Sequence, residues 1–119
     1  MKSILISIAA ILFFASTDGL TGKWESLPSP TDGRVATVIF NENKTFETYM
    51  NGAPYINGNY SYSSKDSIFT IDDPNCGDVV GSYKVNFFSN GDSLYFSAID
   101  DKCEERKARV EAIILGRVK

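Results

Sequence analysis

The feature that most constrains the fold is a succession of short alternating segments separated by strong turn sequences. Apolar and aromatic residues alternate with polar ones, and no stretch sustains a helical period over more than about ten residues. Asn-Gly and Asp-Gly pairs, as at 32–33, 51–52 and 90–91, accept the positive φ of tight hairpin turns. The sequence therefore predicts an all-β chain in which most neighbouring strands pair antiparallel.

Each predicted strand has one apolar and one polar face, as Ala36, Val38 and Phe40 show against Thr37. Strands with one solvent-exposed face and one buried face indicate a sandwich or a barrel. Sequential hairpins favour an antiparallel up-and-down β-barrel of about eight strands, which removes exposed edges, and a Greek-key sandwich is the alternative. The predicted strands are 23–25, 34–40, 45–50, 55–63, 67–71, 80–87, 93–99 and 111–118.

One short helical turn is predicted at 103–109. Asp101 is placed to cap it, with Glu104 three residues later, and Glu105 and Arg109 have the spacing of an i,i+4 ion pair. We interpret these charges as a capped, solvated turn. The alternative is a patch that faces a partner.

Residues 1–19 have the character of a secretory signal peptide, with Lys2 followed by a mainly apolar stretch over 4–14 and then small residues. The apolar stretch is shorter than the about 20 residues that span a bilayer, so stable membrane insertion is not expected once it is cleaved. Cleavage after Thr17 or after Gly19 fits the small-residue rule, and a start near Leu20 is favoured. The predicted domain is then 20–119, secreted or periplasmic.

Cys76 and Cys103 are the only two cysteines, and both lie in the exported part. An even count in an oxidising compartment predicts a disulfide, which would remove about 3.6 kcal/mol of unfolded-state entropy in the chain-entropy model. A redox or metal pair is disfavoured, because CxxC spacing and histidine are both missing.

The charge balance restricts the partners. The chain has 12 basic and 15 acidic side chains, a net charge of −3, and loss of Lys2 and Asp18 leaves that difference unchanged. Nucleic acid and anionic membrane surfaces are therefore not expected as partners, since both are bound through excess Lys and Arg. A basic protein partner would suit this charge better.

No enzyme signature is present. The sequence has no histidine and no GxSxG, P-loop or GxGxxG pattern, so an enzyme and a cofactor are not expected. Asp72, Asp73, Asn75 and Asp78 offer oxygen ligands for calcium, but their spacing and Pro74 favour turn residues, and no metal is expected.

Three segments resemble small secreted bacterial lipocalin-like (calycin) domains. The segment 20–24, with Gly22 and Trp24, is similar to the Gly-x-Trp opening strand of lipocalins, and 40–46, Phe-Asn-Glu-Asn-Lys-Thr-Phe, is similar to a hairpin of that group. Residues 101–106 and 115–117 are similar to its C-terminal pattern. The resemblance implies that a basic residue packs over Trp24 and closes the barrel; Arg117 fits best and Arg106 is second.

The aromatic residues bear on function, because an eight-stranded barrel is wide enough either to be filled by side chains or to hold one small ligand. We expect phenylalanines to fill most of the lumen, while inward tyrosines need hydroxyl partners and often line a mouth. The candidate lumen or mouth residues are Phe40, Phe46, Tyr60, Tyr62, Tyr83 and Phe96.

Two functions remain open. The resemblance implies a carrier of a small apolar ligand. The alternative is a secreted protein-binding module, such as a lysozyme or protease inhibitor, with loop 27–33, stiffened by Pro28 and Pro30, as its contact surface.

Overall fold

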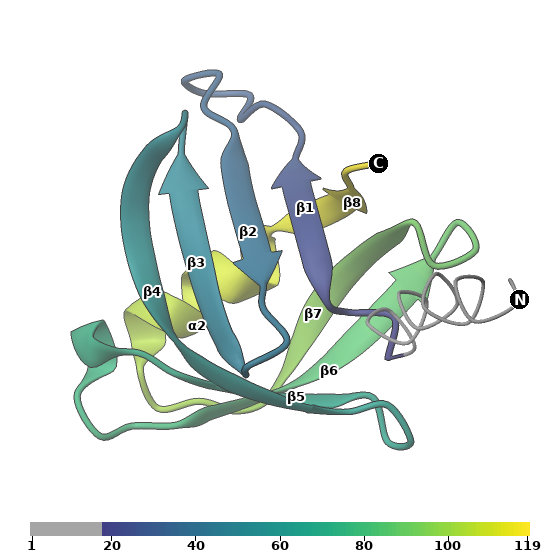
Figure 1. Ribbon diagram of the computed structural model, residues 1–119. Helices are drawn as coiled ribbons and strands as arrows, with labels where there is room; N and C mark the ends of the chain where they lie inside the picture. Colours follow the sequence, from purple (N-terminus) through teal and green to yellow (C-terminus); the bar gives the residue numbers. More distant parts are fainter. Residues whose placement is uncertain (1–17) are drawn as a thin grey trace, which may run out of the picture.

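Eight antiparallel strands follow one another around a closed barrel, each paired with the next and the last paired with the first (Figure 1). The structure is a computed structural model that describes residues 18–119, so the predicted signal peptide lies outside the described residues except for Asp18 and Gly19. The predicted up-and-down barrel is confirmed. The strands are β1 (Gly22–Ser26), β2 (Ala36–Phe40), β3 (Thr45–Met50), β4 (Ala53–Ser63), β5 (Ile68–Asp72), β6 (Gly81–Phe88), β7 (Ser93–Asp100) and β8 (Ile114–Arg117).

Tight turns join most of these strands where the sequence placed them. Asn51 and Gly52, between β3 and β4, have φ values of 52° and 85°, and Asn90 and Gly91, between β6 and β7, have 59° and 85°. Asn and Gly are the residues that adopt positive φ most readily, so the two turns use the local chemistry that the sequence offers.

Closure depends on the pairing of β1 with β8, in which Trp24 lies opposite Arg117 and Ser26 opposite Leu115. β8 in turn pairs with β7, with Leu94 opposite Leu115. A four-residue last strand therefore completes the cylinder and leaves no open edge.

The C-terminal part differs from the prediction. The helix α2 spans Glu104–Ala112, so the last predicted strand, 111–118, begins in a helix and is a strand only over β8. The helix extends because its inner side contacts the barrel: Arg106 is fully buried, and Val110 packs against the core. A single-turn 3-10 helix, η2 (Pro74–Cys76), connects β5 to β6.

The predicted cap of this helix is wrong. Cys103 occupies the N-cap position without a side-chain hydrogen bond, and Asp101 is buried beside Arg106. These two charges belong to the interior, so they are neither a solvated turn nor a patch that faces a partner. Local sequence did not show this, because Asp73 and Val79, which complete the surroundings of Arg106, come from a distant part of the chain.

The inward faces meet in an aromatic cluster inside the barrel. Phe69 lies 5.6 Å from Phe40, 5.7 Å from Tyr60 and 5.1 Å from Phe96, measured between ring centroids. All four rings are almost completely buried. Among the described residues no helix is both long and apolar enough to cross a membrane.

Candidate functional site

One end of the barrel is sealed around Trp24. Its side chain is fully buried, and its indole Nε1 donates a hydrogen bond of 2.8 Å to the carbonyl of Leu20. The guanidinium carbon of Arg117 lies 4.3 Å from the Trp24 ring centroid, a cation–π geometry. Arg117 also donates to the carbonyl of Gly19 at 2.6 Å and to that of Gly91 at 3.2 Å. These bonds join both ends of the described chain to the β6–β7 turn.

Gly22 belongs to the same end. Its φ is 132°, in the region that favours glycine, and a Cβ placed there would lie 3.8 Å from the Arg117 guanidinium. The structure thus brings together Gly22, Trp24 and Arg117 and does not bring Arg106 to them.

Arg106 instead forms a buried ionic network beneath α2. Its guanidinium donates to both carboxylate oxygens of Asp101, at 2.8 and 2.9 Å, and to the carbonyl of Val79 at 2.9 Å. A longer contact of 3.4 Å joins it to Asp73, and the side chains of all three residues are at most 1% exposed. Tyr83 adds a hydroxyl hydrogen bond to Asp101. Every buried polar side-chain atom of the described residues has a partner, as buried charge requires.

This network changes the acidity of its members. Burial alone would raise the pKa of Asp101, but hydrogen bonds from Arg106, Tyr83 and the Cys103 N–H outweigh burial and lower it to about 2. Burial, together with the bond to Asp101, raises the pKa of the Tyr83 phenol well above its usual range. Asp101 is therefore ionised and Tyr83 neutral at any physiological pH. Their side chains hold the network in place rather than exchange protons.

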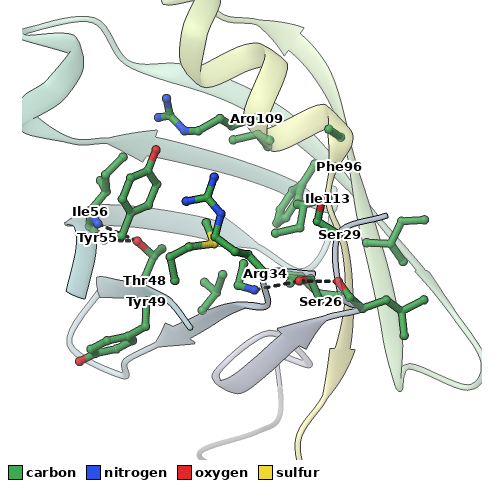
Figure 2. A pocket seen from close by; sticks show the side chains of 18 of the residues that line it. Ser26, Ser29, Arg34, Thr48, Tyr49, Tyr55, Ile56, Phe96, Arg109 and Ile113 are labelled. Carbon is green, nitrogen blue, oxygen red and sulfur yellow. Dashed lines mark hydrogen bonds between the residues drawn. The ribbon is translucent and has the colours of Figure 1, made fainter. Parts of the chain in front are cut away.

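The opposite end of the barrel contains a cavity of about 730 Å³. Its walls come from strands β2 to β5, β7 and β8, from the β1–β2 loop and from α2. Figure 2 shows lining residues from the loop, β3, β4, β7 and α2, among them Arg34, Thr48 and Arg109. The lining is mainly apolar. Its central apolar members are Ala36, Val38, Phe40, Phe46, Ile56, Phe69, Ile71, Phe96, Val110, Ile113 and Leu115.

Polar groups on the inner wall are already bonded. The Thr48 hydroxyl accepts the Ile56 N–H at 2.8 Å and donates to the Ile56 carbonyl at 2.5 Å, where the β3–β4 register shifts (Figure 2). Its only O–H donor is therefore used within the barrel wall. Arg106 and Asp73 also reach the wall, but they belong to the network beneath α2.

The predicted lining residues divide into two groups. Phe40, Phe46 and Phe96 line the cavity, whereas the three tyrosines do not. Tyr60 donates its hydroxyl to the Asn41 carbonyl at 2.9 Å, near the sealed end. Tyr83 bonds to Asp101, and Tyr62 is half-buried against the core. Aromatic rings pack together in one part of the lumen, and a cavity remains at the opposite end.

Several lining residues were not singled out from the sequence. Alternation placed Ala36 and Val38 on the inward face, so their orientation was predicted. The cavity beside them was not predicted. Nothing in the sequence indicated that Arg34 and Arg109 line a cavity, because this depends on where the β1–β2 loop and α2 lie in space. These four residues all line the cavity.

Cys76 and Cys103 form a disulfide, with sulfur atoms 2.06 Å apart, that ties η2 to the start of α2.

Asp73, one of the predicted turn residues, does cap η2, since its carboxylate accepts the Asn75 N–H at 2.9 Å. Among residues 18–119 no group of three or more His, Cys, Asp or Glu side chains is arranged to hold a metal ion.

The fold and the cavity define a class: a closed eight-stranded antiparallel barrel, sealed at one end by Trp24 and hollow at the other. Comparison of the sequence with protein-family models and with curated proteins finds no match.

Proposed function

We propose that this protein is a secreted, lipocalin-like carrier that holds a small apolar ligand in its barrel. The observation that carries the proposal is the apolar cavity of about 730 Å³. Ligand pockets are typically about 300–1,000 Å³, with walls that are mostly hydrophobic. The packing of Arg117 over Trp24 supports the lipocalin-like part of the proposal, because it is the arrangement that the sequence resemblance implies.

The chemistry of the inner wall favours an apolar ligand. The Thr48 hydroxyl uses its only donor on the Ile56 carbonyl, and Arg106 uses its guanidinium on Asp101, Asp73 and Val79. A polar ligand deep in the cavity would lose its water without gaining equivalent bonds, which is unfavourable. An alkyl chain carries no such penalty.

A series of straight-chain alcohols tests the carrier proposal by isothermal titration calorimetry. Each buried methylene contributes about 0.8 kcal/mol, so Kd should fall roughly fourfold per added carbon until the cavity is full. The apolar burial should also give a negative heat-capacity change. If no alcohol from hexanol to tetradecanol binds, the carrier proposal is wrong.

Export is the second part of the proposal, and Asp18 and Gly19 bear on where the signal peptide is cut. Asp18 accepts the N–H groups of Leu20 at 2.9 Å and Thr21 at 3.0 Å, while Gly19 accepts from Arg117. A start at Leu20 would remove these contacts and place an ammonium group on a fully buried residue. We therefore expect cleavage after Thr17.

The intact mass of the exported protein measures the cleavage site. A mass that begins at Asp18 is the expected result. A mass that begins at Leu20 would contradict the inferred site, and a full-length chain retained in the cell would contradict export.

One observation favours protein binding as a second candidate function. Leu27, in the β1–β2 loop, is 80% exposed and lies at the cavity mouth with Pro28 and Pro30 of the same loop, so the loop presents an apolar surface there. If the loop is an inhibitory surface, the purified protein should inhibit a basic lysozyme saturably, and Leu27→Ser should relieve the inhibition. Lack of inhibition by the wild-type protein would remove this candidate.

A further inference from the structure

The mouth of the cavity differs in charge from the rest of the molecule. The five charged residues on the cavity wall are Asp32, Arg34, Asp73, Arg106 and Arg109. Asp73 and Arg106 belong to the buried network with Asp101, which leaves two arginines and one aspartate at the mouth. A locally positive opening on a chain with a net charge of −3 requires an explanation.

Of the two arginines, Arg109 gives the stronger indication of a ligand site. It lies in the last turn of α2, is half-buried and lines the cavity. No salt bridge or side-chain hydrogen bond joins it to another residue of 18–119, and the expected pair with Glu105 is not among the ion pairs of that range. A guanidinium without a carboxylate partner at the rim of an apolar cavity has its donors available to a ligand.

Arg34 offers the same chemistry from the other side of the opening. It comes from the β1–β2 loop, and only its Nε is used, in a bond of 2.8 Å to Asp32. Its two terminal nitrogens have no partner among the described residues. Figure 2 shows Arg34 and Arg109 together at this part of the pocket, with the Tyr55 hydroxyl directed to the same side. A guanidinium fork matches a carboxylate, with two parallel hydrogen bonds.

The floor of the cavity supplies the complementary half of a binding site. Phe40, Phe46 and Phe96 are at most 5% exposed and lie at the inner end, toward the aromatic cluster. A ligand that satisfies both ends has an alkyl tail against these rings and an anionic head at the mouth.

We propose that the ligand is a single-chain amphiphile with a carboxylate head, bound tail-first, with its head between Arg109 and Arg34. This inference rests on the proposed carrier function and specifies its ligand class. Arg34 and Arg109 act as specificity residues: they select the anionic head, while the apolar wall supplies the affinity that any chain of equal length would gain.

The test compares three ligands with the same chain and different heads: dodecanoate, dodecanol and dodecylammonium. Titration calorimetry at pH 8 and low salt, below the micelle concentrations, measures Kd for the wild-type protein, for Arg109→Gln, Arg34→Gln and the double variant. Lys107→Gln is the matched control, because it removes one positive charge from the same helix but Lys107 does not line the cavity.

The wild-type protein should bind dodecanoate roughly three- to tenfold more tightly than dodecanol, the contribution typical of a partly exposed charge-assisted contact, and dodecylammonium more weakly than either. Each single arginine variant should reduce this preference, and the double variant should abolish it, so that the double variant binds dodecanoate no more tightly than dodecanol. Lys107→Gln should keep the preference. Higher salt should reduce it, because charges near solvent are screened.

The opposite outcomes are distinct. If dodecanoate and dodecanol bind the wild-type protein equally, the carboxylate inference is wrong and the carrier function stands. If the double variant retains the preference, the assignment to these arginines is wrong. If none of the three ligands binds, the carrier function fails and this inference fails with it.

Discussion

At the scale of single residues, Arg106 shows how the role of a charged side chain can depend on a distant partner. In the sequence it lies in a charged segment that we interpret as a solvated turn, and it is the second choice to pack over Trp24. In the structure it is fully buried and joins Asp101 and Asp73, which is 33 residues away in the chain. A buried charge of this kind is stable only because each of its partners is present.

We predict that Arg106→Met lowers the free energy of unfolding by about 3–5 kcal/mol, because it leaves Asp101 and Asp73 buried without a counter-charge. Urea denaturation followed by circular dichroism measures the change. Lys107→Met, next in the same helix and outside the network, is the control and should change stability by less than about 0.5 kcal/mol. A small effect of Arg106→Met would mean that water reaches these carboxylates.

Asp101 makes the stability depend on acid pH. Its pKa in the folded protein is about 2, below the ordinary 3.8, so its stabilisation is complete above about pH 4 and is lost as the pH falls toward 2. The loss attributable to this group is about 2 kcal/mol. Urea midpoints between pH 4.5 and 2 should therefore fall more steeply for the wild-type protein than for Asp101→Asn. Parallel curves would contradict the assignment.

At the scale of elements, α2 is positioned mainly by long-range links. The disulfide holds the N-cap residue of the helix to η2, and Val110 reaches the core. Arg106 joins the helix to Asp73 and Asp101, which directly follow β5 and β7. Asp101 is also bonded by Tyr83 of β6. Since α2 also forms one wall of the cavity, these links determine the shape of the site.

We predict that Cys76→Ser with Cys103→Ser lowers the free energy of unfolding by about 2–4 kcal/mol, chiefly because the unfolded chain gains freedom. The Arg106 network should keep α2 folded, so helical circular dichroism should change little. Reduction of the wild-type disulfide should give the same loss, while a reducing agent should have no effect on the double variant. A loss of helix signal would show that the disulfide alone holds α2.

At the scale of the whole molecule, the barrel has a close-packed end and an end that contains a cavity. Trp24, Leu20 and the aromatic cluster occupy the first, and the cavity occupies the second. Empty space in a core lowers stability because its lining forgoes dispersion contacts. A barrel that keeps such a space has not been optimised for stability alone.

A side chain that fills the cavity should therefore raise the free energy of unfolding and weaken ligand binding. We predict that Val38→Phe, on the inward face of β2, raises the free energy of unfolding by about 1 kcal/mol and weakens alcohol binding at least tenfold. Thr37→Phe adds the same ring on the outer face and should leave binding unchanged. Unfolding curves and the calorimetric titration provide the two readouts. If Val38→Phe binds dodecanol like the wild-type protein, the ligand does not occupy this cavity.

The sequence predicted much of this architecture because its strongest signals are local. Alternation depends only on which neighbours face the same side, and the turn at Asn51 and Gly52 depends only on backbone preferences of those two residues. The boundary between α2 and β8 was harder, because residues 111–112 can be helical or extended and the burial of Arg106 and Val110 decides between them.

What the chain determined by itself is therefore the set of strands, their inward faces, the turns that join them and the cysteine pair that can be bridged. Only the tertiary structure decided that Arg117 packs on Trp24, that Arg106 is buried between nearby Asp101 and distant Asp73, and that a cavity remains in the lumen with Arg34 and Arg109 at its mouth. The physical reason is that patterning follows from neighbours along the chain, whereas a cavity is a volume left between elements, and no single segment encodes what its neighbours fail to fill.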